Sequence, residues 1–460
     1  METVEAGSRR RPRRRPRGVD ALAALAGVGL GAVVAQWWVT IPSVAGGTAN
    51  LLLAGGQLAG LLAGYFALLG LLLAARVPML DATIGLDRLV GLHARLGRWT
   101  LLLMVGHAVT VTLGYAAMAR AGFLAELWTL LRRYPWVLPA ALGLALMVVA
   151  GVASWWRVRQ RMRYGAWWAL HLSMYLGVAL AVPHQITNGS AFVGHPLAQA
   201  LWLGLVGLAF GCLLAFRVGL PLVRAFRHRL RVADVVEEAP DVVSVVMSGV
   251  RLDRLPLAGG QFAHWRFHAP GLRCPAHPYS ISGLLPGNRL RITVRTSGDH
   301  SGLLRRLQRG TAVVMEGPYG AFTAQARHNG GPVTLVAGGV GITPIRALLE
   351  DLPPETAPTV LYRASHDGDL ILRDEVDALV RERGGTVHHL VGSRGTQPMT
   401  SRRLTELVPD IAGHTLYVCG PPGFTANVLA AARDAGVPRR QVHHENFRLH
   451  PADARKREST

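Results

Sequence analysis

The pattern of hydrophobic positions divides the chain into two unlike halves. Residues 19–220 consist of long apolar runs of Leu, Ala, Gly, Val and Trp, whereas residues 230–460 mix short apolar segments with charges and turn residues. Six of the apolar runs have the length of a helix that crosses a bilayer, about 20 residues. They cover residues 19–41, 51–75, 89–118, 136–156, 165–187 and 197–220. The pattern predicts an all-α membrane domain of six helices over residues 19–220, preceded by a basic arm at 1–18.

The second half predicts two further domains. Short alternating segments separated by Gly and Pro over residues 231–325 are typical of a small antiparallel β-barrel. Its expected strands are 242–248, 261–267, 278–282, 289–295 and 311–316. Residues 331–450 alternate strand and helix, as a parallel α/β sheet of Rossmann-like type does. The strands expected there are 333–338, 359–365, 386–393, 415–420 and 441–447, and a tail follows at 451–460.

The basic charge points to a lipid partner. The net charge is +21, and most of the basic residues are Arg that flank the apolar runs or fill the amino-terminal arm. Such placement favours an anionic lipid surface over nucleic acid, which we do not expect as a partner. The three cysteines, Cys212, Cys274 and Cys419, have no cluster-binding spacing, so neither an iron–sulfur centre nor a disulfide framework is expected.

The loops predict an orientation. Arg residues gather in the amino-terminal arm, between the second and third spans, between the fourth and fifth, and after the sixth. The loop at 188–195 has no Lys or Arg, and the loop between the third and fourth spans is mixed, with Arg120, Arg132 and Arg133 against Glu126. Because positive loops stay in the cytoplasm, we expect an integral protein of the plasma or inner membrane with both termini cytoplasmic. Spans three and five then run in the same direction.

Four histidines in these two spans predict haem sites. His93 and His107 are 14 residues apart in span three, and His171 and His184 are 13 apart in span five. Each offset corresponds to about 20 Å along a helix. His93 is therefore expected to face His171 and His107 to face His184, so that each pair supplies two axial imidazoles to one haem iron. A single intramembrane His is more often a buried polar residue satisfied by a neighbouring helix, but two matched pairs are hard to explain in that way.

The arrangement of these histidines resembles the ferric reductase transmembrane domain shared by ferric reductases and NADPH oxidases. The resemblance implies two b-type haems, an inner one held by His93 and His171 and an outer one held by His107 and His184. Pro183, directly before His184, can bend its helix.

The segment HPYSIS at 277–282 suggests a flavin site. An aromatic residue followed by Ser on a strand can lay Tyr279 against a flavin ring and turn the Ser280 hydroxyl toward the cofactor. The segment 298–301 opens a predicted short helix whose amides favour a pyrophosphate. This stretch resembles the FAD-binding domain of the ferredoxin–NADP reductase superfamily, with His in place of the usual Arg, as in the haem-containing oxidase and reductase branch. The resemblance implies FAD contacts from His277, Pro278, Tyr279, Ser280, Ser282, Gly298 and Ser301.

The glycine-rich segment at 338–344 suggests a nucleotide site. It follows a predicted buried strand, and its GxGxxP pattern lets the backbone approach a phosphate at a helix amino terminus. In the superfamily that it resembles, a Cys-Gly-Pro segment lies by the nicotinamide, a Ser-Arg pair meets the 2′-phosphate of NADP, and a Glu-x-aromatic covers the flavin. The residues that match are Gly339, Gly341, Thr343, Pro344, Cys419, Gly420, Pro421, Ser393, Arg394 and Phe447. NADPH is favoured and NADH is possible, because Arg394 can equally be a solvated side chain.

The order of domains predicts a path for electrons. NAD(P)H would reduce FAD, and FAD would pass single electrons to the two haems and then to an external acceptor. Three interpretations of the function remain open. The acceptor is a ferric or other metal chelate, or it is dioxygen, as in a superoxide-producing NADPH oxidase. Alternatively, the membrane half is a haem sensor or anchor, and the soluble half is a flavin reductase that serves a cytosolic partner.

Overall fold

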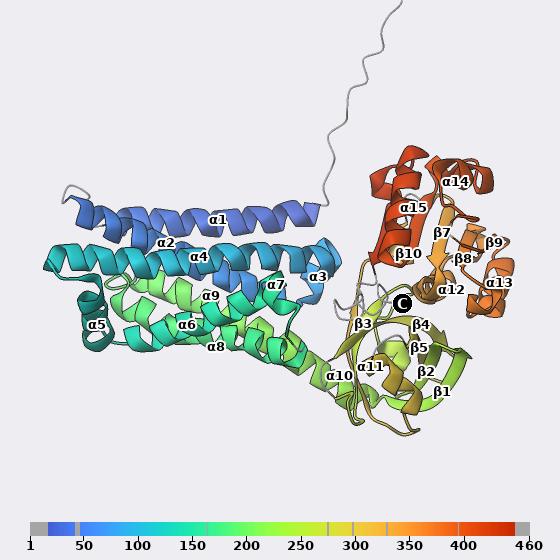
Figure 1. Ribbon diagram of the computed structural model, residues 1–460, viewed down its shortest axis with the longest axis horizontal. Coiled ribbons are helices and arrows are strands. Elements are labelled where there is room, and N and C mark those ends of the chain that lie inside the picture. The colour runs from blue at the N-terminus through green and yellow to red at the C-terminus, as the bar shows by residue number, and fades with distance from the viewer. Residues whose placement is uncertain are drawn as a thin grey trace, which may run out of the picture. The chain divides into compact units, whose positions relative to one another are not determined.

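The computed structural model describes residues 17–41, 47–162, 164–273, 276–296, 299–327, 330–393 and 395–446. The chain forms two compact units, Met1–Leu214 and Ala215–Thr460. The first unit is helical, and the second contains an antiparallel sheet and a parallel sheet (Figure 1).

All six predicted spans are helices. In the described part of the chain, six helices are long and apolar enough to cross a membrane. They are α1 (Arg17–Thr40), α2 (Thr48–Ala74), α4 (Leu86–Ala119), α6 (Val137–Ser154), α8 (Tyr164–Asn188) and α9 (Pro196–Leu214). The sixth span is longer than the pattern predicts, because a π-helical turn (Ala215–Gly219) and α10 (Leu220–His228) continue it.

Three short helices lie between the spans where the sequence predicts loops. They are α3 (Pro78–Ile84), α5 (Phe123–Arg133) and α7 (Trp156–Arg159). Helix α5 is amphipathic: it buries Leu130 and Glu126 and exposes Leu124 and Trp128. With 11 residues it is too short for a membrane span, which is why the search for long apolar runs misses it.

Glycines allow the spans to approach each other closely. On α2, Gly56, Gly60 and Gly64 recur every fourth residue, and a Cβ at any of them would lie within 3 Å of a side chain from a neighbouring helix. Helices α6 and α8 meet in the same way at Gly143 and Gly177. Small residues at such spacing are the usual way in which membrane helices pack, because lipid supplies no hydrophobic force between them.

Six strands form the antiparallel sheet, in the order β1-β2-β5-β4-β3-β6. Five of them were predicted: β2 (Val242–Ser248), β3 (Phe262–Phe267), β4 (His277–Leu285), β5 (Arg289–Arg295) and β6 (Val313–Tyr319). The sequence analysis missed β1 (Arg231–Ala239), an irregular strand with two bulges whose acidic residues weaken its apolar alternation. Backbone hydrogen bonds also join Val232 to residues 310 and 311, which precede β6.

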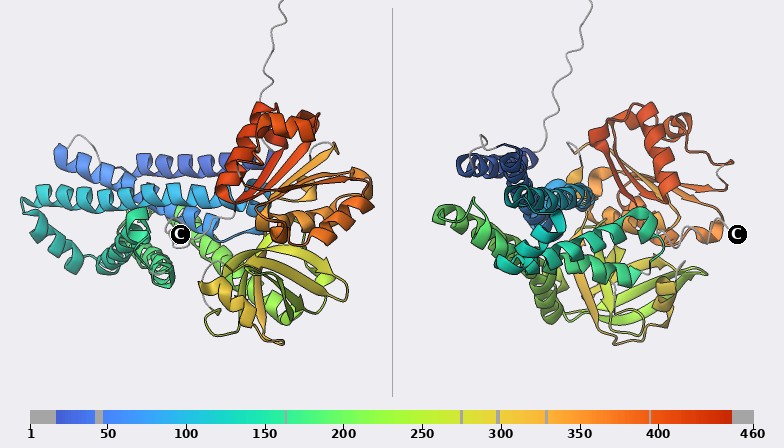
Figure 2. Two further views of the ribbon diagram at one scale, coloured as in Figure 1. Left: turned by 45° about the vertical axis from the view of Figure 1, so that its right-hand side comes forward. Right: turned by 60° about the vertical axis from the view of Figure 1, so that its left-hand side comes forward.

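The parallel sheet has the order β11-β10-β7-β8-β9 and confirms the expected alternation of strand and helix. Its strands are β7 (Val333–Gly338), β8 (Thr359–Ala364), β9 (Thr386–Val391), β10 (Thr415–Gly420) and β11 (Val442–Asn446). Helices α12 (Ile342–Asp351) and α13 (Arg373–Glu382) share one apolar core with the sheet, and α14 (Ser401–Leu407) and α15 (Pro422–Asp434) share another. Figure 2 shows helices on both faces of this sheet.

Candidate functional site

The four membrane histidines meet in two pairs. The ring centres of His93 on α4 and His171 on α8 are 6.1 Å apart, and those of His107 and His184 are 6.4 Å apart. An ideal helix would turn His171 and His184 about 140° away from each other. Both nevertheless face α4, and Pro183 lies inside this helix, where its missing N–H and its ring disturb regular geometry.

The two separations suit a metal bound between the rings. A metal–imidazole nitrogen bond is about 2 Å long. The centre of an imidazole ring lies about 1.1 Å from its nitrogens, given bonds of about 1.33 Å. A metal held on the line between two rings therefore separates their centres by about 6.3 Å. Both pairs agree with this value, so the residues present fit a bis-imidazole haem iron.

Hydrogen bonds at the δ nitrogens prepare three of the rings as ligands. The Nδ1 atoms of His93 and His107 lie 3.0 and 2.7 Å from the carbonyl oxygens of Gly70 and Gly56 on α2. Since a carbonyl only accepts, each Nδ1 carries a proton, and in the neutral ring the lone pair then lies on Nε2. Such a partner fixes the tautomer and the orientation of a metal-binding imidazole.

His171 is oriented by a serine and a tryptophan. Ser154 donates to the carbonyl oxygen of Ala150 at 2.7 Å, so its oxygen accepts from His171 Nδ1 and from Trp167 Nε1, both at 3.2 Å. The Trp167 ring also stacks on His171, with ring centres 5.2 Å apart. Trp167 precedes His171 by one turn of the same helix, whereas Ser154 could not be paired with His171 from the sequence, because only folding brings α6 and α8 together.

The HPYSIS segment lies on β4, as predicted. The rings of His277 and Tyr279 are nearly parallel, with centres 6.2 Å apart, so the two side chains lie on the same side of the strand. Pro278 between them is exposed. Ser280 is buried, and its hydroxyl has no hydrogen-bond partner among the described residues. A buried hydroxyl of this kind fits a polar group of a bound cofactor.

Ser282 occupies a different environment from Ser280. Its side chain is fully buried, and its Oγ accepts from Arg291 Nε at 3.2 Å and from Thr293 Oγ1 at 2.9 Å. Its hydroxyl is therefore engaged within the protein.

The glycine-rich segment forms a tight turn at the end of β7. Gly339 has a φ of 54°, and a Cβ at Gly341 would lie 2.2 Å from the carbonyl oxygen of Cys419. Only glycine fits there, because the turn packs directly on the end of β10. Thr343 is fully buried in the first turn of α12, and its hydroxyl has no partner among the described residues. Pro344 follows it and is also buried.

A cation that the sequence analysis did not single out lies beside this turn. Two guanidinium nitrogens of Arg295, at the end of β5, lie 3.8 and 3.9 Å from the position of a Cβ at Gly339. An ion pair of 2.9 Å with Asp241 holds the guanidinium in place. A guanidinium next to a glycine turn and a helix amino terminus is suited to a phosphate.

The carboxyl ends of the parallel strands gather the remaining predicted residues. Cys419 and Gly420 end β10, and Pro421 precedes α15. Glu445 on β11 is the register partner of Cys419. Burial raises the pKa of the Cys419 thiol well above its ordinary value, and the Glu445 carboxylate raises it further, so the thiol stays protonated at neutral pH.

Two of the remaining predicted residues, Ser301 and Ser393, lie in described segments. Ser301 lies on the short helix α11 (Asp299–Gly302). Ser393 is exposed and accepts a hydrogen bond from the amide of Thr396 at 3.3 Å, in the turn after β9. Gly298, Arg394 and Phe447 lie outside the described residues.

Two family models match this chain, one in each half. Residues 59–182 match the family "Ferric reductase like transmembrane component", and residues 335–429 match "Oxidoreductase NAD-binding domain". Ferredoxin–NADP reductase B of Sorangium cellulosum is 30% identical over 214 residues, which cover 42% of this chain and 81% of that protein. The flavohemoprotein of Pseudomonas aeruginosa is 29% identical over 48% of this chain and 58% of its own length.

Solved structures resemble about half of the chain. The FAD/NAD-binding domain of the nitric oxide dioxygenase of Vibrio cholerae is 24% identical, covers 48% of this chain and 98% of that domain, and has a TM-score of 0.41. The chain spans less than two thirds of the length of the flavohemoprotein.

The two halves together define an integral membrane oxidoreductase that binds FAD and NAD(P). The chain belongs to the family in which a ferric reductase-like transmembrane domain is fused to a ferredoxin–NADP reductase-like FAD and NAD(P) module.

Proposed function

We propose that the protein carries electrons from cytoplasmic NAD(P)H through FAD and two b-type haems to an acceptor on the other side of the membrane. When bound, FAD would supply two-electron acceptance and one-electron release, and haems held by the two histidine pairs would supply one-electron carriers within the bilayer. The observation that carries the proposal is the separation of the two histidine pairs, 6.1 and 6.4 Å, on the same two helices.

The proposed tasks of the protein's own groups are binding and orientation. His93 with His171, and His107 with His184, would supply four axial imidazoles. The rings of His277 and Tyr279 would lie against FAD, and the buried hydroxyl of Ser280 would bind one of its polar groups. No side chain has to exchange a proton for the membrane part of the path.

For the nucleotide, we propose a site at the carboxyl edge of the parallel sheet. The Gly339–Gly341 turn, the Thr343 hydroxyl and the Arg295 guanidinium would hold phosphates, and Cys419 and Gly420 would lie by the nicotinamide. Ser393, Arg394 and Phe447 keep the roles that the family resemblance implies, with NADPH favoured over NADH.

The proposed acceptor is a ferric or other metal chelate. Arg120 precedes α5, and Arg132 and Arg133 form its last turn, in the loop that the orientation rule would place outside. They offer positive charge to an anionic chelate. Dioxygen is the competing acceptor. Ferric-chelate reduction measured beside superoxide release, with the same membranes and NADPH, separates the two.

The decisive test combines a spectrum with one substitution. Purified protein reduced with dithionite should show low-spin b-type absorption, with about two haems and one FAD per chain. His184→Ala should lower the haem content and abolish reduction of an external, membrane-impermeant acceptor. Normal external reduction by His184→Ala would refute the path across the membrane and favour a flavin reductase that serves a cytosolic partner.

A further inference from the structure

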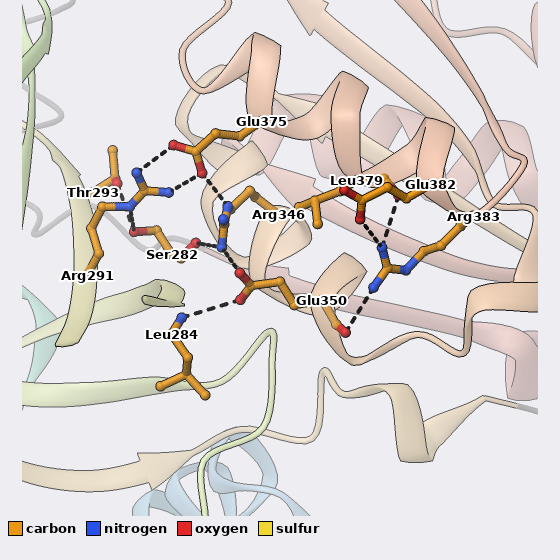
Figure 3. Close-up of polar contacts among 10 residues, drawn as sticks. All are labelled: Ser282, Leu284, Arg291, Thr293, Arg346, Glu350, Glu375, Leu379, Glu382 and Arg383. Atoms are coloured by element: carbon orange, nitrogen blue, oxygen red, sulfur yellow. Dashed lines mark hydrogen bonds and ion pairs between the residues drawn. The ribbon is translucent and has the colours of Figure 1, made fainter. Parts of the chain in front are cut away.

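A network of charged side chains joins the antiparallel sheet to helices α12 and α13, which share an apolar core with the parallel sheet (Figure 3). Arg291 on β5 donates from both terminal nitrogens to the two carboxylate oxygens of Glu375 on α13, each at 2.7 Å. Arg346 on α12 donates from Nε to the same carboxylate, also at 2.7 Å. Both arginine side chains are only 8% exposed, whereas the Glu375 side chain is 38% exposed, so buried guanidinium groups meet a carboxylate at the edge of the contact.

The network also reaches the strand that carries the predicted flavin residues. Arg346 Nη1 donates to the carbonyl oxygen of Ser282 at 3.1 Å and to the carboxylate of Glu350, and Arg291 Nε donates to the Ser282 hydroxyl. Two guanidinium groups therefore face two carboxylates, and the buried charge is balanced. We call Ser282, Arg291, Arg346, Glu350 and Glu375 the Arg346 network.

Two glycines lie directly against helix α12 beside Arg346. A Cβ at Gly283 would lie 2.2 Å from Arg346 Nη1, and a Cβ at Gly259 would lie 2.0 Å from the carbonyl oxygen of Ala347. The amide of Gly259 donates to the carboxylate of Asp351 at the end of α12. Helix α12 therefore contacts Gly283 on β4 and Gly259 in the loop before β3 without space for a side chain at either position, and its position relative to β4 is closely defined.

The network lies close in sequence to both the proposed flavin site and the proposed nucleotide site. Ser282 is two residues from Ser280, and Arg346 is three residues from Thr343. The two buried hydroxyls without partners among the described residues therefore stand on segments that Arg346 joins directly. A shift of Arg346 would move the start of α12 relative to the flavin strand.

We propose that the Arg346 network is a positioning device that sets the separation between the flavin and the nicotinamide for hydride transfer. This inference rests on the proposed function. Reacting atoms must lie about 3–3.5 Å apart, and a displacement of about 1 Å can cost about 100-fold in rate. The planar forks of two arginines fix an orientation, which sliding apolar surfaces do not.

The test measures flavin reduction in the purified full-length protein loaded with FAD. Glu375→Gln keeps the shape of the side chain and removes its charge, and Arg346→Lys keeps the charge and removes the fork. Stopped-flow mixing with NADPH should show the limiting rate of flavin reduction falling at least about 10-fold in each variant. FAD per chain and the Kd for NADP⁺ should stay within about twofold of the values for the unmodified protein. Because both variants act through one network, the double variant should lose less than the product of the two effects.

The matched control is Glu406→Gln, which removes an exposed ion pair of 3.0 Å with Arg402 on α14 of the same module. It should leave the limiting rate unchanged. A normal limiting rate in both network variants would overturn the proposal, and so would equal losses of FAD and NADP⁺ binding, which indicate general destabilisation. If Glu375→Gln does not fold, Arg346→Lys decides alone. Failure of the unmodified protein to oxidise NADPH or NADH would instead refute the proposed function.

Discussion

Gly60 determines how closely helix α2 can approach the outer histidine pair. A Cβ at this position would lie 2.7 Å from His107 Nδ1, the atom that lies within hydrogen-bonding distance of the Gly56 carbonyl oxygen. Any side chain at position 60 must push α2 away or turn the imidazole, and the second result would spoil its orientation as a ligand.

We therefore expect Gly60→Leu to lower the haem content from about two to about one per chain, measured by the pyridine haemochrome of purified protein. Leu is a good helix former, so helix propensity does not explain such a loss. Gly55→Leu on the same helix is the control, because nothing lies within 4 Å of a Cβ there. Equal haem content in the two variants would contradict this role of Gly60.

Ser154 is a second residue whose effect is indirect. Its oxygen accepts from both His171 and Trp167, so Ser154→Ala leaves two donors without this partner. Loss of such a supporting group typically weakens metal-site affinity about 10- to 100-fold. We expect faster haem loss to apomyoglobin from Ser154→Ala membranes. Ser173→Ala on α8 is the comparison, because that hydroxyl only donates to the Leu170 carbonyl of its own helix; the same rate in both variants would argue against the prediction.

At the scale of elements, arginines of the π-helical turn (Ala215–Gly219) and of helix α10 join both to strand β6. Glu316 is 4% exposed and pairs with Arg217 at 2.6 Å and with Arg266 at 3.6 Å. Arg224 on α10 donates to the Gly317 carbonyl oxygen. Removing one partner of a buried carboxylate leaves its charge poorly compensated, at a cost of several kcal/mol when no other partner remains.

Because Arg266 remains in Arg217→Ala, we expect that variant to lose about 2 kcal/mol of unfolding free energy. Arg309→Ala breaks an ion pair with Asp234 in which the Arg is 76% exposed, and it should leave the unfolding midpoint almost unchanged, because solvent screens such a pair. Denaturant unfolding of the purified protein, followed by flavin fluorescence, compares the two. Equal midpoints would show that the Arg217 pair contributes nothing.

The contact between α13 and β5 predicts a dependence on pH. Burial of the Glu375 carboxyl raises its pKa, but hydrogen bonds and ion pairs with Arg291 and Arg346 outweigh burial and hold the pKa below its ordinary value. A carboxyl whose pKa is lower in the folded state stabilises the fold above its unfolded pKa, about 4.3, and loses that effect as pH falls through the folded pKa.

Glu375→Gln should therefore be less stable than the unmodified protein near pH 7. The difference should shrink as the pH drops below about 4. Thermal unfolding of both proteins between pH 3 and pH 7 measures it. A difference that stays constant over this range would show that ionisation of Glu375 does not stabilise the fold.

For the whole molecule, the distribution of Arg predicts which loops face the cytoplasm. We expect a membrane-impermeant maleimide to label Val193→Cys in intact cells and to spare Arg161→Cys until the membrane is broken. Both positions are exposed and lie in different loops. Unmodified protein is the background control for the native cysteines, and the opposite labelling pattern would invert the proposed topology.

Local sequence patterns predicted most, but not all, of the helices and strands of the whole molecule. The six spans and the parallel strands follow from runs and periodicities that a few neighbouring residues determine, and the structure confirms them. Strand β1 and helix α5 were missed, because a bulged, acidic strand and a short amphipathic helix carry little apolar signal. The positions of the four histidines and of the HPYSIS and GxGxxP segments were likewise visible in the sequence.

The amino-acid sequence by itself determined which segments enter the membrane, which form sheets, and which residues are chemically suited to haem, flavin and nucleotide. The tertiary structure alone decided that Ser154 supports His171 and that Arg346 joins strand β4 to helix α13. The physical reason is that hydropathy and turn chemistry act between near neighbours. Hydrogen bonds and ion pairs between distant segments exist only after packing has brought those segments together.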